Sequence, residues 1–283
     1  AQTFTGVTSF ADGSAGAPSI TNTGDVNTGI FFPAADTIAF AEGGAEAMRI
    51  DSSGHVGIGT SSPNIANFGK AFTINDPASS NQIPAIELAY GSNTRGANIA
   101  VDNRASSKVL AITAVASDLS MTFGTNNTER MRIDTTGAVT KPLQPAFQAK
   151  VSSQINNMTV GGSSNTLIPF ASEIFDQNAD YNTNGTFTAP VTGKYWLSFF
   201  IRLESIDTAT TTYDIILDTS NRNYTHRFDP DYGDSDTNFY HVNISVLADM
   251  DASDTAVVRY YVDGGTAQTD IDSDSNFMGY LAC

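Results

Sequence analysis

The 283-residue sequence has one cysteine, one tryptophan, three histidines and few basic residues, and these scarcities exclude several classes of protein. Cys283 alone cannot form a disulfide within the chain, so a small disulfide-bonded secreted scaffold is excluded. Only 14 Lys and Arg stand against 30 Asp and Glu, which gives a formal net charge of −16. Binding to a phosphate backbone depends on basic residues, so we expect no nucleic-acid partner.

Long apolar runs are also missing. No stretch approaches the roughly 20 apolar residues that cross a bilayer as a helix, and no basic segment followed by an apolar leader opens the sequence. We therefore expect no membrane insertion. Because the sequence opens on Ala1 rather than Met, we also expect a processed product or a fragment of a longer chain.

Side chains suited to catalysis are equally sparse. His55, His226 and His241 lie in unrelated sequence contexts, and no Gly-x-Ser-x-Gly or comparable nucleophile motif accompanies them. His226 and His241 are better explained as polar residues on strand faces than as a pair of residues that face each other across neighbouring strands. His55 is predicted to be a turn residue. The sequence therefore favours a protein that is not an enzyme.

The densest aromatic content lies between Ile168 and Ile201 and contains the only tryptophan. From Tyr195 to Ile201 every residue except Ser198 is β-branched, aromatic or leucine, which is the composition of a strand. One face of that strand holds Tyr195, Leu197, Phe199 and Ile201. The opposite face, with Trp196 and Phe200, is also apolar. Because a β-sandwich buries one face of each sheet, we predict that Trp196 and Phe200 lie in an interface between subunits.

Short motifs around this strand occur in a characteristic order. They are Pro145-Ala-Phe147, Ile174-Phe-Asp176, Tyr181-Asn182, Gly185-Thr-Phe-Thr-Ala-Pro-Val191, Gly193-Lys-Tyr-Trp-Leu-Ser-Phe199 and Phe277-Met-Gly-Tyr-Leu281. The sequence from about Pro142 to Cys283 resembles the globular C1q domain, a family related to the tumour necrosis factor fold. The resemblance implies a jelly-roll β-sandwich that assembles as a homotrimer. It does not imply one particular function.

The first half of the chain contains an internal repeat. The segment Ala45–Val56 aligns with Thr128–Val139 at an offset of 83 residues, and Phe40 aligns with Phe123 at the same offset. Short apolar runs separated by Gly, Ser and Asn turns surround both copies. Strands this short cannot bury their own apolar faces, so they must stack on neighbours or on other chains.

The first copy of the repeat continues through Gly57-Ile-Gly-Thr-Ser-Ser-Pro63, whereas the second leads directly into Thr140-Lys-Pro142. This pattern resembles repeats of bacteriophage tail fibres and related trimeric adhesins. We therefore predict an all-β chain with two parts. Residues 1–140 are a trimeric fibre shaft of repeated β units (copies near 36–63 and 118–140), and residues 141–283 are a C1q/TNF-like jelly-roll head.

Acidic loops in the head are candidates for a metal site. Four carboxylates, those of Asp229, Asp231, Asp234 and Asp236, lie in one short loop, and hard oxygen ligands at this density suit calcium. A second run, Asp270–Asn276, lacks the Gly and the bidentate Glu of an EF-hand loop. Solvated acidic loops are the alternative for both segments. No other cofactor is expected.

Recognition of a surface is the function that this organisation favours. Tyr224, Tyr232 and Tyr240 lie near the polar loops of the head and are candidate receptor-binding residues, because tyrosine combines an apolar ring with a polar tip. We predict a virion tail fibre, extracellular, that binds a host surface glycan or protein receptor and attaches to other virion tail components. The alternatives are a capsule-degrading depolymerase, whose inter-subunit carboxylate pair the sequence does not specify, and a purely structural fibre whose head is a trimerisation clamp.

Overall fold

The structure is a computed structural model that describes residues 5–64, 66, 69–75, 84–90, 94–102, 109–161, 165–231 and 235–283. These residues form strands and turns without any helix, which confirms the predicted all-β fold class. Within the same residues, no helix is long and apolar enough to span a membrane.

The chain divides into two compact units. The first comprises Ala1–Met121 with Asp134–Thr136, and the second comprises Thr122–Ile133 with Gly137–Cys283. The predicted boundary between shaft and head near residue 140 stays a prediction.

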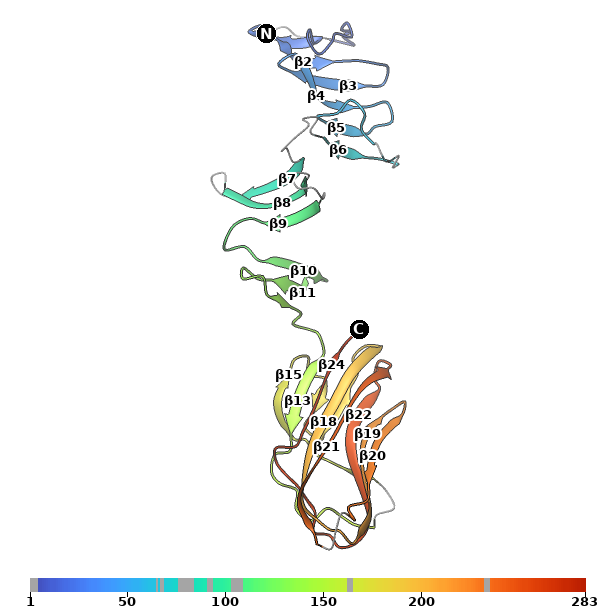
Figure 1. Cartoon of the computed structure of the whole chain (residues 1–283). Coiled ribbons are helices and arrows are strands. Elements are labelled where there is room, and N and C mark those ends of the chain that lie inside the picture. Colours follow the sequence, from blue (N-terminus) through green and yellow to red (C-terminus); the bar gives the residue numbers. More distant parts are fainter. Residues whose placement is uncertain are drawn as a thin grey trace. The chain divides into compact units, whose positions relative to one another are not determined.

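The first unit contains two sheets of short strands, in which most neighbouring strands are antiparallel (Figure 1). One sheet runs in the order β1-β2-β3-β4-β5-β6, in which β5 and β6 pair in parallel. Its strands are β1 (Ile20–Asn22), β2 (Asp25–Phe31), β3 (Ile38–Glu42), β4 (Ala45–Ile50), β5 (Val56–Ile58) and β6 (Phe72–Ile74). The other sheet consists of β7 (Ala85–Tyr90), β8 (Thr94–Asp102) and β9 (Val109–Ala114).

A further small sheet holds the second copy of the sequence repeat. It consists of β10 (Met121–Thr125), β11 (Thr128–Ile133) and β12 (Val139–Thr140). Strands β4 and β11 share one alternation of exposed and half-buried residues. In β4 the Nε of Arg49 lies 2.6 Å from Oε1 of Glu46, and in β11 Arg132 and Glu129 make the same ion pair at 3.0 Å. The two copies therefore have the same local structure, as the repeat predicts.

The surroundings of His55 differ from those expected of a simple turn residue. It is 9% exposed, its Nδ1 lies 2.9 Å from Oδ2 of Asp51, and its Nε2 lies 2.9 Å from Nδ2 of Asn64. These contacts fix the turn after β4 against the segment that follows β5. The second copy carries Ala138 at this position, so the repeat retains its strands but not this buried contact.

The head is a sandwich of two antiparallel sheets (Figure 1). The first sheet has the order β15-β13-β24-β18-β21, with β23 paired to β18. Its strands are β13 (Ala146–Lys150), β15 (Ser172–Asp176), β18 (Gly193–Ile206), β21 (Thr237–Met250), β23 (Asp270–Ile271) and β24 (Asn276–Leu281). The second has the order β16-β17-β22-β19-β20, with β14 paired to β22. Its strands are β14 (Thr166–Leu167), β16 (Tyr181–Asn182), β17 (Thr186–Thr188), β19 (Thr210–Thr219), β20 (Asn223–Phe228) and β22 (Thr255–Gly264).

Aromatic side chains fill the space between the two sheets of the head. The ring of Phe147 stacks on Tyr181 and Phe187, with centroid distances of 4.7 and 4.8 Å, and meets Phe277 edge-on at 5.0 Å. Its own exposed fraction is 1%. The motifs at the start, the middle and the end of the head therefore converge on one core.

Candidate functional site

The two apolar faces of the long strand β18 lie as predicted, one toward the sandwich core and one away from it. Its inward residues are completely buried in the sandwich core; they are Tyr195, Leu197, Phe199 and Ile201. Trp196, Ser198 and Phe200 alternate with them and point away from the core. The outer face of this sheet is therefore apolar at its centre in a single chain.

Side chains of the neighbouring strands extend this apolar surface. In register, Trp196 lies between Leu247 of β21 and Tyr280 of β24, and its ring centroid is 5.4 Å from that of Tyr280. Leu247 is 60% exposed and Tyr280 is 46% exposed. We call the outward side chains of Trp196, Ser198, Phe200, Leu247, Met278 and Tyr280 the β18 face.

One edge of the β18 face is polar. Arg202 follows Phe200 on the same side of the strand and pairs with Glu204 at 3.0 Å, Asp272 at 2.5 Å and Asp274 at 3.2 Å. Within the described residues, the buried side-chain atoms without a hydrogen-bond partner are Nε of Arg202 and Oδ1 of Asn276. Asn276 lies opposite Phe200 in register, so the polar groups beside this face are incompletely satisfied in one chain.

Three loops meet at the end of the head opposite the C-terminus (Figure 1). The carboxylate of Asp207 accepts hydrogen bonds from the backbone N of Ala209 at 2.8 Å and of Thr266 at 2.5 Å, and from Oγ1 of Thr266 at 2.9 Å. Asp236 accepts hydrogen bonds from the backbone N and Oγ1 of Thr208, and from Nε2 of Gln268. The two carboxylates therefore tie the loops after β18, β20 and β22 together.

The hydrogen bonds change the acidity of both carboxyl groups. Burial by itself raises the pKa of Asp207, but the three donated hydrogen bonds outweigh burial, and the pKa lies below the ordinary value of 3.8. The hydrogen bond from Gln268, followed by those from Thr208, lowers the pKa of Asp236. Each ionised carboxylate therefore stabilises the folded head.

We expect acid to loosen this end of the head. Because the pKa of Asp207 is lower in the folded than in the unfolded chain, its stabilising contribution is complete above the ordinary pKa and is lost as the pH falls through the folded pKa. Thermal unfolding of the full chain, followed from about pH 5 to about pH 2, should show a smaller acid-induced decrease for Asp207→Asn than for the unchanged protein. The matched variant Asp263→Asn, at an exposed position of β22, should retain the full decrease. Equal slopes for all three proteins would contradict the role of Asp207.

The structure describes three of the four predicted calcium ligands. Oδ1 of Asp229 accepts a hydrogen bond from the backbone N of Asp231, and Asp236 is engaged as described above. Asp234 lies outside the described residues. No group of three or more His, Cys, Asp or Glu side chains among the residues that the structure describes is arranged to hold a metal ion. Calcium binding at this loop stays a prediction.

The second acidic run has other partners. Asp270 accepts hydrogen bonds from Nε2 of Gln154 and the backbone N of Asn157, both at 2.8 Å. Asp272 and Asp274 pair with Arg202. These carboxylates therefore join the end of the chain to the start of the head and to β18.

The candidate receptor-binding tyrosines have unequal surroundings. Tyr224 and Tyr240 are partly buried and pack against the core, and the ring of Tyr240 stacks on Phe228 at a centroid distance of 4.5 Å. Tyr232 lies outside the described residues. The structure therefore gives Tyr224 and Tyr240 a packing role, and their contact with a receptor stays a prediction.

The two histidines of the head do not form a pair. His226 lies on the inward side of β20 with Tyr224 and Phe228 and is edge-on to the ring of Phe228. His241 is exposed on β21, and its ring centroid is 5.1 Å from that of Phe200. His226 therefore faces the interior of the sandwich, whereas His241 faces outward.

A polar hollow at the β15, β16 and β17 edge of the sandwich was not predicted. It has a volume of about 580 Å³ and its lining includes Glu173, Asp180 and Tyr181. Burial raises the pKa of Asp180, the Asn178 side chain opposes this effect, and nearby Asp176 adds to it. The sequence does not predict this hollow, because its lining comes from separate strands and turns that only the folded sandwich brings together.

Known proteins are similar to the head. The family model of the C1q domain matches residues 146–282, and these residues form a C1q-like domain. The globular domain of zebrafish complement 1qA protein is 18% identical, with 50% of this chain and 98% of that chain covered and a TM-score of 0.36. Murine APRIL is 12% identical, with 49% and 98% covered and a TM-score of 0.34. No curated protein matches the chain.

Proposed function

We propose that this chain is a homotrimeric tail fibre of a bacteriophage virion, which recognises a glycan or protein on the host cell surface through its head. In this proposal the protein acts outside the cell as part of the virion, binds rather than cleaves its receptor, and attaches to other tail components. The repeat shared by Ala45–Val56 and Thr128–Val139 supports the fibre assignment, because it resembles the repeats of such fibres.

The observation that carries the proposal is the β18 face. Leu247 and Tyr280 remain about half exposed in one chain, and Trp196 lies between them. An apolar patch on a soluble protein marks an interaction site. A trimer that buries this face presents three copies of the loop end tied by Asp207 and Asp236, and three weak contacts bind together far more tightly than one.

Binding of the fluorescently labelled full chain to a panel of bacterial strains tests the proposal. We expect the trimer to bind cells of at least one strain. Competition by purified surface polysaccharide, or protease treatment of the cells, should then remove this binding. Monomers should bind the same cells at least about 100-fold more weakly, because multivalency is lost. A trimer that binds no strain of a broad panel would favour a purely structural fibre instead.

The hollow beside Asp180 is the best-placed site for the alternative function of polysaccharide cleavage. A glycosidase needs an acid with a raised pKa beside a second carboxylate, and Asp180 and Glu173 share this hollow. Incubation of the full chain with the bound polysaccharide should leave the number of reducing ends unchanged if the protein only binds. Release of reducing ends that Asp180→Asn abolishes would instead establish a depolymerase.

A further inference from the structure

One face of the sheet β7-β8-β9 consists entirely of apolar side chains. They are Ile86, Leu88, Ala97, Ile99, Val101, Leu110, Ile112 and Ala114, which we call the aliphatic face. Its six larger members are between 44% and 70% exposed. Among the residues of the sheet whose side chains the structure describes, none on this face is charged.

The pairing register makes the aliphatic face continuous. Ile86 lies opposite Ile99, and Ile99 lies opposite Ile112, so three isoleucines form one row across the sheet. Val101 lies opposite Leu110 in the next row on that face. Apart from Val109, the opposite face of the same strands carries mainly small or polar residues; they include Ala85, Glu87, Asn98, Ala111 and Thr113. The two faces therefore differ sharply in chemistry.

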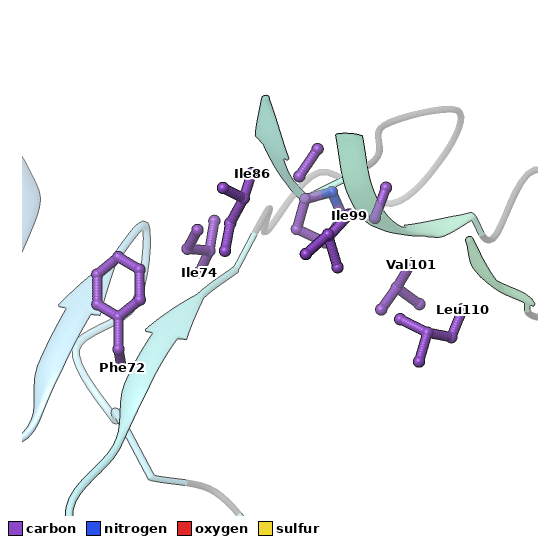
Figure 2. Close-up of a pocket in the computed structure, with 9 residues that line it drawn as sticks. Phe72, Ile74, Ile86, Ile99, Val101 and Leu110 are labelled. Carbon is purple, nitrogen blue, oxygen red and sulfur yellow. The ribbon is translucent and has the colours of Figure 1, made fainter. Parts of the chain in front are cut away.

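The apolar surface continues beyond this sheet. Figure 2 shows Phe72 and Ile74 of β6 together with Ile86, Ile99, Val101 and Leu110. These side chains, with Pro84, Ala85 and Ala100, line a hollow of about 190 Å³, and every residue that lines it is apolar. Phe72 is itself 58% exposed.

Few of the described hydrophobic side chains up to Met121 are buried within a single chain. Among the described residues up to Met121, the buried hydrophobic side chains are those of Phe31, Ala39, Ala41 and Ala100. A three-stranded sheet requires a packed hydrophobic face for stability, and soluble monomers rarely leave a large apolar patch in contact with water. The aliphatic face therefore requires a partner.

We infer that the aliphatic face packs against the same face of two further copies of this chain, around a three-fold axis. This inference rests on the proposed homotrimer. The chain carries a net charge of −16, so two copies repel each other overall, whereas the aliphatic face adds no charge to this repulsion. An anionic lipid surface is a poorer partner for so acidic a chain, and a basic partner would find no carboxylate on this face.

The same packing explains why the repeat units also leave apolar side chains exposed. Phe40 of β3 and Phe123 of β10 occupy equivalent positions of the two copies and are 36% and 44% exposed. Each copy therefore presents an equivalent phenylalanine to solvent in a single chain. We expect these phenylalanines to contribute to the same association along the shaft.

Cysteine crosslinking of the full chain tests the inference. The native thiol is removed by Cys283→Ser, and one cysteine is then introduced by Ile112→Cys on the aliphatic face or by Thr113→Cys, one residue further on the opposite face. Disulfides form only where two Cα atoms come within about 7 Å, so Ile112→Cys should give covalent dimers about tenfold faster than Thr113→Cys under mild oxidation. Ile99→Cys, in the same row on β8, should behave as Ile112→Cys does.

Sedimentation of each protein separates this inference from the proposed function. A trimer in which Ile112→Cys and Ile99→Cys crosslink no faster than Thr113→Cys would overturn the assignment of the aliphatic face and leave the homotrimer intact. An unmodified chain that sediments as a monomer would overturn the homotrimer itself.

Discussion

Trp196→Asp should convert the proposed homotrimer into monomers whose heads remain folded. Trp196 lies at the centre of the β18 face and contacts Tyr280, but it does not belong to the buried core of its own chain. Loss of a central aromatic residue weakens an interface by at least about 2 kcal/mol per copy, and a buried unpaired carboxylate adds a further desolvation penalty. Sedimentation velocity should therefore show about one third of the trimer mass, while the circular dichroism of the β-sandwich persists.

The matched control for this substitution is Thr225→Asp. Thr225 is exposed on β20, at an outward position of the other sheet of the head, where the same charge meets solvent. We expect this variant to remain trimeric. Trimers formed by Trp196→Asp, or monomers formed by both variants, would contradict the assignment of the interface to the β18 face.

Phe147→Ala should give the largest loss of folding stability in the head. Its ring contacts Tyr181, Phe187 and Phe277, so truncation leaves a cavity where four aromatic rings meet. Removing a buried phenylalanine side chain lowers the free energy of unfolding by about 3 to 5 kcal/mol. Urea denaturation of the full chain, followed by tryptophan fluorescence, should show the transition of the head at a correspondingly lower urea concentration.

The control for Phe147→Ala is Val191→Ala, at a site that is 47% exposed in the turn before β18. Truncation there should change the free energy of unfolding by no more than about 0.5 kcal/mol. A loss for Phe147→Ala of the same small size would show that the four rings do not form a cooperative core.

Several local features of the fold were predictable from sequence. The alternation of Tyr195 and Leu197 with Trp196 and Ser198 predicts the two faces of β18, because successive side chains of a strand always point to opposite sides. The repeat predicts the shared structure of β4 and β11, since both copies keep the Met-Arg-Ile sequence and the Glu residue that pairs with the Arg. These predictions depend on residues that are close together in the sequence.

Other features depend on pairs of residues far apart in the sequence. Asp207 binds Thr266, and Asp236 binds Gln268, across loops that come together only when the sandwich closes. His55 lies in a segment of turn residues, yet Asp51 and Asn64 enclose it. No local pattern distinguishes these polar side chains from the solvated ones around them.

The sequence by itself determined that the chain is all-β, that residues from about Pro142 to Cys283 form a C1q-like sandwich, and that Trp196 shares a strand face with Phe200. Only the tertiary structure decided that Tyr280 lies beside Trp196, and that Ile86, Ile99 and Ile112 form one row. The reason is physical: the side-chain period of a strand is a local property, whereas the register between strands depends on which distant segments pair and on how their connecting turns close.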